Sequence, residues 1–290
     1  MRIGVVLEIG DEGRGVPSYD EIRAHARAAE AAGLDSIWVY DHLLFRFAEG
    51  ETTGIHECWS VLAGLAEATS RIALGTLVMC TSFRNAGLLA KMAATVDHMS
   101  GGRLILGVGC GWHDPEYDAF GYPTDHRVSR FAEALEVIAS LIRTGRADLD
   151  GRWVTARDAA LVPPARPDLP ILVASRRPRM LELTARYADA WNVAWFAEPD
   201  DELRALHAEL LAACARVGRD PAEIEVTAGI TVRYPGAPDG ETPALRGTPA
   251  EIAGALAAHA AAGVDHVTVV LEPFTADTLA AFVEAVALYR

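Results

Sequence analysis

The sequence predicts a single α/β domain over residues 1–290, folded as an eight-stranded parallel (β/α)8 barrel of the TIM type. Three observations lead to this prediction. A helix–glycine–strand junction recurs along the chain, eight apolar segments alternate with eight helical ones, and no GxGxxG motif follows the first apolar segment. A chain of 290 residues is long enough for one such barrel.

The recurring junction joins the end of an alanine-rich helix to the start of an apolar strand. The sequence AAGLD at 31–35 precedes the apolar run 36–39, and AAGVD at 261–265 precedes the run 266–270. A degenerate copy, RYAD at 186–189, leads into 190–193. Glycine is favoured just after a helix because it adopts the left-handed conformation there, and a short loop can then begin the next strand.

The same alternation continues through the chain. The predicted strands are continuously apolar, as expected for parallel strands that are buried on both faces. They lie near 2–8, 36–41, 72–79, 103–109, 170–174, 190–194, 224–232 and 265–271. The predicted helices lie near 18–32, 57–69, 85–98, 127–144, 177–188, 200–217, 248–262 and 275–289.

Eight strand–helix units favour a closed barrel, with an open doubly wound sheet as the alternative. The absence of GxGxxG after the first strand removes the usual sign of a dinucleotide-binding sheet. The long connections 42–56, 110–126 and 233–247 follow strands two, four and seven, and 145–169 precedes strand five. Because the loops after the strands form the active-site face of a barrel, the first three are predicted to be functional. No domain boundary is convincing.

Composition and charge exclude several classes of protein. Hydrophobic residues make up 51% of the chain, but no run of eighteen apolar residues occurs, so no membrane span is expected. The first residues lack the pattern of a signal peptide, which predicts a cytoplasmic protein. A net charge of −14 argues against nucleic acid as a partner. The four cysteines are scattered, so neither a disulfide framework nor a metal site is expected.

Asp41 and His42 are the first candidate functional residues, because a polar pair interrupts the apolar run at the end of strand two. Histidine can act as a general acid or base near neutral pH. The alternative is that the two residues begin a loop or bond to each other.

Two further strand ends have suggestive sequences. The segment GVGCGWH at 107–113 follows strand four, and its glycines would let the backbone approach a flat ligand, although a tight turn explains them equally well. Cys110 is expected to pack as a small apolar residue. Ala174, Ser175 and Arg176 lead into a helix whose N-terminus could bind phosphate, unless the arginines belong to a solvated face.

Three other residues, two after strand four and one on strand six, have both a functional and a structural interpretation. Trp191 can line a pocket or fill the barrel. Asp114-Pro115 is a plausible helix start, so Glu116 and Tyr117 can be structural.

Taken together, these segments resemble the bacterial luciferase-like superfamily, which includes FMN-dependent monooxygenases and coenzyme F420-dependent oxidoreductases. The resemblance covers residues 1–195 and is weaker beyond. Its most specific stretch is LGVGCGW at 106–112, followed by EYDAFG at 116–121. The other matching segments are 38–43, 66–76, 89–97, 100–103, 170–173 and 185–192.

The resemblance implies a barrel, commonly dimeric, that binds FMN or coenzyme F420 at the strand ends. His42 would stand beside the ring as the catalytic residue. Leu77 and Val78 occupy the place of a bulge, often with a non-prolyl cis peptide, that backs the ring. The remaining residues expected at the cofactor are Asp41, Gly109, Cys110, Ala174, Ser175 and Arg176, and those expected at the substrate are Trp112, Tyr117 and Trp191.

The sequence departs from the family pattern at three places. Ala174-Ser175 stands where the phosphate loop usually has Gly-Gly, and Asn85-Ala86 stands where Asn-Pro is common. Trp112 replaces the acidic residue of the family's F420-dependent sugar-phosphate dehydrogenases, which disfavours that activity.

The predicted function is therefore redox chemistry on a small organic substrate. With reduced FMN, oxygen would be a co-substrate. With F420, a hydride would pass between cofactor and substrate. A flavin reductase or F420 reductase could supply the reducing equivalents. The alternatives are a non-catalytic flavin-binding barrel and a non-redox barrel enzyme for a phosphorylated metabolite. Lys91, the single lysine of the chain, lies on a predicted helix, which excludes Schiff-base chemistry.

Overall fold

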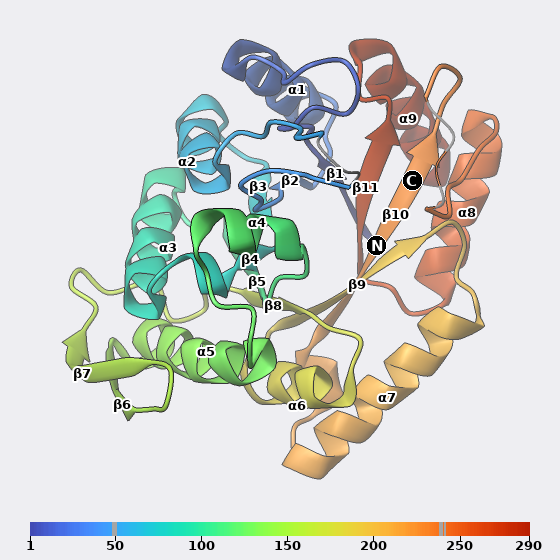
Figure 1. The fold of residues 1–290 in the computed structure, drawn as a ribbon. Helices are drawn as coiled ribbons and strands as arrows, with labels where there is room; N and C mark the ends of the chain where they lie inside the picture. The colour runs from blue at the N-terminus through green and yellow to red at the C-terminus, as the bar shows by residue number, and fades with distance from the viewer. Residues whose placement is uncertain (48–50, 238–239, 241) are drawn as a thin grey trace.

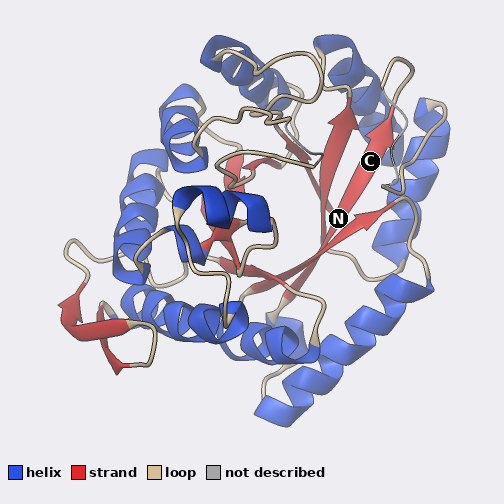
Figure 2. Ribbon diagram, in the orientation of Figure 1, coloured by secondary structure: helices blue, strands red, loops and turns tan. Residues whose placement is uncertain are grey.

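A computed structural model describes residues 1–47, 51–237, 240 and 242–290. Parts of two long predicted connections, at 48–50, 238–239 and 241, lie outside the described residues. Figure 1 shows strands gathered at the centre of the molecule and helices around them, and Figure 2 shows the same arrangement by element type.

The strands close into the predicted parallel barrel. Neighbours pair in the order β3-β2-β1-β11-β10-β9-β8-β5, and β3 also pairs with β5, which completes the ring. The closed ring excludes the doubly wound sheet. The barrel strands are β1 Arg2–Val6, β2 Ser36–Val39, β3 Ala73–Thr76, β5 Leu104–Gly109, β8 Ile171–Ala174, β9 Ala190–Phe196, β10 Glu225–Arg233 and β11 His266–Glu272.

Eight of the helices surround the barrel near the positions that the sequence predicts. They are α1 Tyr19–Ala31, α2 Cys58–Ala68, α3 Ala86–Ser100, α5 Arg127–Thr144, α6 Pro178–Tyr187, α7 Asp201–Val217, α8 Pro249–Ala261 and α9 Ala276–Tyr289. The junction glycines behave as expected, since Gly33 and Gly263 have φ of +77° and +86°. Among the described residues, no helix combines the length and the apolar character that crossing a lipid bilayer requires.

The structure corrects three details of the predicted elements. The predicted strand 72–79 is interrupted, because β3 ends at Thr76 and β4 (Met79–Cys80) resumes after Leu77 and Val78. The connection 110–126 contains the short helix α4 (Asp114–Phe120), which crosses the barrel mouth in Figure 1. The connection 145–169 contains the hairpin of β6 (Arg146–Asp150) and β7 (Thr155–Ala160), whose side chains are mostly exposed and so lack the apolar pattern of a barrel strand. Two short 3-10 turns, η1 (Thr81–Phe83) and η2 (Pro221–Glu223), complete the elements.

A tryptophan fills the interior of the barrel. Trp38 belongs to a small buried cluster with Val6, Ile105, Leu172 and Ala190, separate from the larger core under the helices. Glycines make room for its ring, since a Cβ on Gly75 would lie 2.0 Å from Trp38 Cε3. The interior at this level is therefore packed solid, and any ligand site must lie above it, at the C-terminal ends of the strands.

Below the tryptophan, a chain of polar contacts occupies the N-terminal ends of the strands. Trp38 Nε1 donates to Ser36 Oγ at 2.7 Å, and Ser36 Oγ lies 2.7 Å from His266 Nε2. On its other side, His266 Nδ1 is 3.4 Å from Glu225 Oε1. The carboxylate of Glu225 favours a proton on Nδ1, and in that tautomer Nε2 accepts from the Ser36 hydroxyl, whose oxygen in turn accepts from the Trp38 indole.

Candidate functional site

The mouth of the barrel brings together His42 and a glutamate that lies 74 residues away in the sequence. His42 Nδ1 lies 2.9 Å from Glu116 Oε1, and the other carboxylate oxygen accepts a hydrogen bond from the backbone N–H of Leu43 at 2.8 Å. Glu116 comes from α4 and is 1% exposed, whereas the His42 side chain is 12% exposed. A carboxylate accepts, so Nδ1 is the donor and Nε2 is left available.

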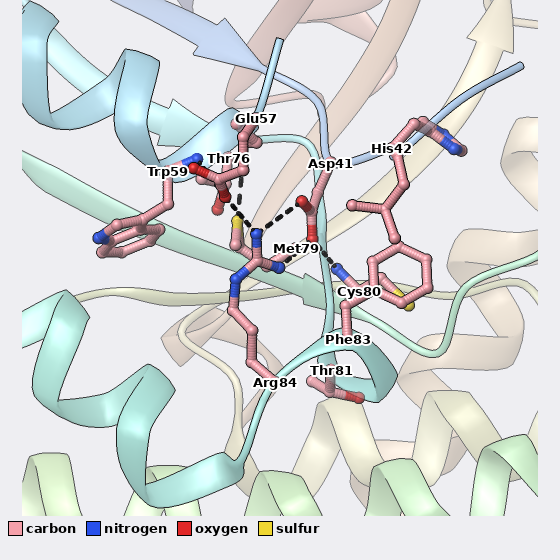
Figure 3. A network of polar contacts seen from close by, with 12 residues as sticks. Asp41, His42, Glu57, Trp59, Thr76, Met79, Cys80, Thr81, Phe83 and Arg84 are labelled. Carbon is pink, nitrogen blue, oxygen red and sulfur yellow. Dashed lines mark hydrogen bonds and ion pairs between the residues drawn. The ribbon is translucent and has the colours of Figure 1, made fainter. Parts of the chain in front are cut away.

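Asp41, the neighbour of His42, is fully occupied by a buried ion pair. Its carboxylate accepts two hydrogen bonds from the Arg84 guanidinium, at 2.6 and 3.0 Å, and a third from the backbone N–H of Cys80 at 2.9 Å. Arg84 also reaches Glu57, the N-cap residue of α2. Figure 3 shows Arg84 between the two carboxylates, with the His42 side chain directed away from them. Asp41 therefore holds the loop that carries His42.

The electrostatics of this ion pair follow from its burial. Burial raises the pKa of the Asp41 carboxyl, and the Arg84 guanidinium opposes that shift. A direct role for the Asp41 side chain at the cofactor would require this pair to open.

The bulge after β3 lies beside the glycines of β5. The peptide between Leu77 and Val78 is cis, as in the bulge of the family that the sequence resembles. A Cβ on Gly109 would lie 2.7 Å from Val78 Cγ2, and one on Gly107 would lie 1.9 Å from the carbonyl oxygen of Thr76. The glycines therefore allow β5 to pack against the bulge. Their predicted approach to a flat ligand stays a prediction.

Cys110 and Tyr117 belong to the packing beneath the mouth. Tyr117 Oη donates to the carbonyl oxygen of Cys110 at 2.9 Å and lies 3.0 Å from Cys80 Sγ. Burial raises the pKa of the Cys80 thiol to about 11 and raises that of Cys110 as well, so neither thiol favours the reactive thiolate form. Tyr117 has no exposed surface, and a substrate would reach it only if this packing changed.

The predicted phosphate loop follows β8, and two of its side chains are already engaged. Ser175 Oγ lies 2.8 Å from Thr184 Oγ1, and Arg176 pairs with Glu202. Arg177, the N-cap residue of α6, provides no side-chain cap, so amide groups of the first helical turn remain without a side-chain acceptor. An anion here would bind to those amides and to the Arg177 guanidinium, which has no ion-pair partner among the described residues. Ala174, half-buried at the end of β8, borders the same turn.

The two predicted substrate tryptophans differ in exposure. Trp191 is buried in the larger core under the helices, and its Nε1 donates to the carbonyl oxygen of Ser175 at 2.8 Å. Trp112 is 59% exposed and packs edge-on against His42 at a ring distance of 5.4 Å. Phe47, 72% exposed, lies roughly parallel to Trp112, with ring centres 6.3 Å apart.

Sequence reasoning missed a set of charged residues at the C-terminal ends of β1 and β11 and in the loop after β1. Glu8 follows β1 and pairs with Arg14, and Glu272 ends β11 and pairs with Arg233. Glu12 accepts a hydrogen bond from Tyr40 Oη at 3.3 Å. Burial raises the pKa of both Glu8 and Glu12. Glu8 ends an apolar strand as Asp41 does, and that signal could have identified it.

The described residues contain no group of three or more metal-ligating side chains placed to hold a metal ion.

Comparison with known proteins identifies relatives along most of the chain. A family model described as luciferase-like monooxygenase matches residues 1–234. A phthiodiolone/phenolphthiodiolone dimycocerosates ketoreductase of Mycobacterium tuberculosis is 36% identical over 223 residues, 70% of this chain and 58% of the relative. The 5,10-methylenetetrahydromethanopterin reductase of Methanolobus tindarius is 29% identical over 208 residues, 72% of this chain and 60% of the relative. The chain thus spans less than two thirds of the length of these relatives.

Solved structures share the fold. An F420-dependent secondary alcohol dehydrogenase in complex with an F420-acetone adduct superposes with a TM-score of 0.85 at 18% identity, covering 100% of this chain and 99% of that one. A riboflavin lyase with modified FMN and riboflavin gives a TM-score of 0.80 at 16% identity, covering 99% and 90%. At these identities the likeness concerns the fold.

Proposed function

The chain belongs to the luciferase-like monooxygenase family, and on that premise we propose that it is an oxidoreductase that uses FMN or coenzyme F420 on a small organic substrate. Relatives named for both kinds of redox chemistry support the proposal. They include the reductases above and pyrimidine monooxygenase RutA of Methylorubrum extorquens, which is 33% identical over 205 residues, 65% of this chain and 56% of the relative.

The observation that carries the proposal is the His42–Glu116 pair at the barrel mouth. Glu116 holds Nδ1, so Nε2 is the atom that would accept or deliver a proton during turnover. A histidine oriented in this way by a buried carboxylate is a common arrangement for general acid–base chemistry. We therefore assign proton transfer at the substrate to His42 Nε2.

The residues present fit a flavin-type cofactor. Leu77 and Val78 form a partly buried apolar edge next to the barrel interior, against which a ring system could lie. The first turn of α6, with the Arg177 guanidinium, could hold the phosphate through uncapped amides. When bound, the cofactor would supply or accept the two electrons of the reaction, and the protein would position it.

Trp112 is the best placed of the predicted substrate contacts. It lies against His42 and forms an aromatic rim with the exposed Phe47 and the partly buried Phe45. Exposed aromatic groups beside a polar catalytic residue suit an apolar substrate. Trp112 and the rim are therefore proposed to hold the substrate body.

Replacing His42 tests the proposal. We expect His42→Ala to bind FMN or F420 as the original chain does, measured by absorbance titration. Turnover with a panel of small ketones, alcohols and heteroaromatic compounds should fall by about 10²–10⁴-fold. His98→Ala, on the exposed side of α3, is the matched control and should keep full turnover.

Three outcomes would contradict the proposed function or a part of it. Unchanged turnover in His42→Ala would remove His42 from the mechanism. Binding of neither cofactor would overturn both redox versions. Tight cofactor binding without turnover of any compound in the panel would favour a non-catalytic flavin-binding barrel.

We also propose that the chain works as a cytoplasmic homodimer, with a separate flavin or F420 reductase as the source of electrons. Light scattering of the purified chain tests the dimer, and a monomer at micromolar concentration would contradict it.

A further inference from the structure

The side chains that face into the barrel form a layer directly above Trp38, at the mouth. Residues two apart in a strand point to the same face of the sheet. Val6, Trp38 and Val270 border the buried interior of the barrel. The residues two positions later are therefore also directed inward, and they are Glu8 after β1, Tyr40 after β2 and Glu272 at the end of β11.

This layer has two unlike halves. The adjacent strands β10, β11, β1 and β2, of which the first three lie side by side in Figure 1, carry the polar half, and Arg233 of β10 is in register with Glu272. At β3, β5 and β8 the inward-facing residues are small or apolar, namely Leu77, Gly107 and Ala174. The proposed function places the cofactor ring against the apolar half, so the polar half faces the substrate.

Two ion pairs in the polar half leave one carboxylate unpaired. Glu8 pairs with Arg14, and Arg233 pairs with Glu272. The Glu8 and Arg233 side chains are only 9% and 5% exposed. Glu12, in the loop after β1, is exposed and forms no ion pair with an arginine or lysine in the described part of the chain. The polar half therefore has an excess negative charge, and that charge lies on the residue that a ligand can reach.

Tyr40 connects this carboxylate to the aromatic rim. Its hydroxyl donates to Glu12 Oε1 at 3.3 Å and accepts from the backbone N–H of Ile9 at 3.4 Å, and both distances are long for hydrogen bonds. The Tyr40 ring lies 6.4 Å from the ring of His42 and 6.4 Å from that of Phe45. Aromatic faces attract cations, and so does an unpaired carboxylate. The two together suit a positively charged organic group.

We propose that Glu12 and Tyr40 form a specificity-determining subsite that binds a basic nitrogen of the substrate as its ammonium ion. Glu12 supplies the negative charge, and Tyr40 supplies an aromatic face and a hydroxyl group. The apolar body of the substrate then lies on Trp112 and Phe47. The inference rests on the proposed function, because it takes the mouth to be the substrate site, and it narrows the substrate to compounds that carry an amine.

Ligands of similar size and different charge test the subsite. The probes are phenethylammonium, neutral phenethyl alcohol and anionic hydrocinnamate, titrated by calorimetry into the full chain saturated with whichever of FMN or F420 it binds. We expect phenethylammonium to bind about tenfold more tightly than either other probe, because its ammonium group gains a charge-assisted hydrogen bond. Glu12→Gln should remove this preference and Tyr40→Phe should reduce it about threefold. Both variants should keep the affinity for phenethyl alcohol within about twofold.

Glu67→Gln is the matched control, because Glu67 is an exposed carboxylate on the outer helix α2. It removes the same charge and should leave all three affinities unchanged. An equal effect of Glu67→Gln would show that the net charge of −14 attracts the cation, and it would overturn the subsite.

Two further results would overturn the subsite and leave the proposed function standing. They are equal or weaker binding of phenethylammonium relative to the other probes, and a preference for phenethylammonium that survives in Glu12→Gln. Binding of neither FMN nor F420 would instead overturn the proposed function, and this inference with it.

Discussion

At the residue scale, the tautomer of His42 is set by a partner on another element. Glu116 uses one oxygen for His42 Nδ1 and the other for the backbone N–H of Leu43. The carboxylate therefore fixes both the proton position on the ring and the start of the loop that carries it. Positioning of this kind acts through the histidine and need not involve contact with substrate.

Exchange of Glu116 for glutamine tests that role. In Glu116→Gln the amide oxygen can still accept from Leu43, which turns the amide N–H₂ toward Nδ1 and favours the tautomer with its proton on Nε2. We expect a fall in turnover of roughly 10²-fold with cofactor affinity retained. Nitrogen NMR of the His42 ring should report the exchanged tautomer. An unchanged ring spectrum would contradict the argument, whatever the activity.

At the scale of elements, the bulge after β3 depends on the glycines of β5, the strand beside it. Gly107 hydrogen-bonds through its backbone to Thr76, and a Cβ at that position would lie 1.9 Å from a backbone oxygen that cannot rotate away. The site geometry at Leu77–Val78 is therefore coupled to the sequence of β5.

Two alanine substitutions separate this steric effect from the general effect of glycine. Gly107→Ala should destabilise the chain by about 1–3 kcal/mol or more, because overpacking forces the backbone to shift. Gly254→Ala lies on the exposed side of α8, where nothing would contact the new Cβ, and should stabilise by about 0.5–1 kcal/mol. Urea denaturation measures both. Equal effects at the two positions would refute the steric account.

The Asp41–Arg84–Glu57 contacts join the end of β2 to the starts of α2 and α3. Removing Arg84 leaves the buried Asp41 carboxylate without its cation, so Arg84→Met should lower the free energy of unfolding by about 3–5 kcal/mol. Arg204→Met removes an exposed i,i+3 ion pair with Asp201 and should lower the free energy of unfolding by only about 0–1 kcal/mol. If Arg84→Met lowers the free energy of unfolding no more than Arg204→Met does, the Asp41–Arg84–Glu57 contacts contribute little to stability.

At the scale of the whole molecule, the two ends of the barrel have separate roles. The upper end carries the site, and the lower end is closed by Trp38 and the Ser36–His266–Glu225 contacts. Burial lowers the pKa of His266, so the folded chain holds this ring in its neutral form. Charging it would require a cation beside the packed barrel interior.

This burial predicts acid sensitivity. The unfolded chain has an ordinary histidine pKa of about 6.5 and the folded chain a lower one, so the stabilisation is complete above about pH 6.5 and is lost as pH falls toward the folded pKa. Between about pH 7.5 and about pH 5.5, His266→Gln should lose less stability than the original chain. Exposed His98→Gln should keep the original loss. Denaturant midpoints at both pH values measure these losses of stability. Equal losses in all three chains would contradict the claim that His266 causes the acid sensitivity. The pKa of buried His259 is lowered too, so some acid sensitivity should remain.

The sequence by itself predicted the barrel, because the helix–glycine–strand junctions and the eightfold alternation of apolar strands with helices are local patterns. It also placed His42 at the end of strand two. The Leu77–Val78 bulge came from the family resemblance, because the apolar pattern alone predicted an unbroken strand over 72–79. It could not determine which residues pack against them. Glu116 lies 74 positions from His42, and nothing in the local sequence of α4 distinguishes it from a first-turn glutamate that stabilises a helix N-terminus.

The tertiary structure decided the roles of the remaining candidates through side-chain direction and burial. Asp41 pairs with Arg84 instead of facing an open site, and Tyr117 has no exposed surface. The sequence predicts which strand ends carry function. The partners of each side chain depend on contacts between residues far apart in sequence, and no local pattern contains that information.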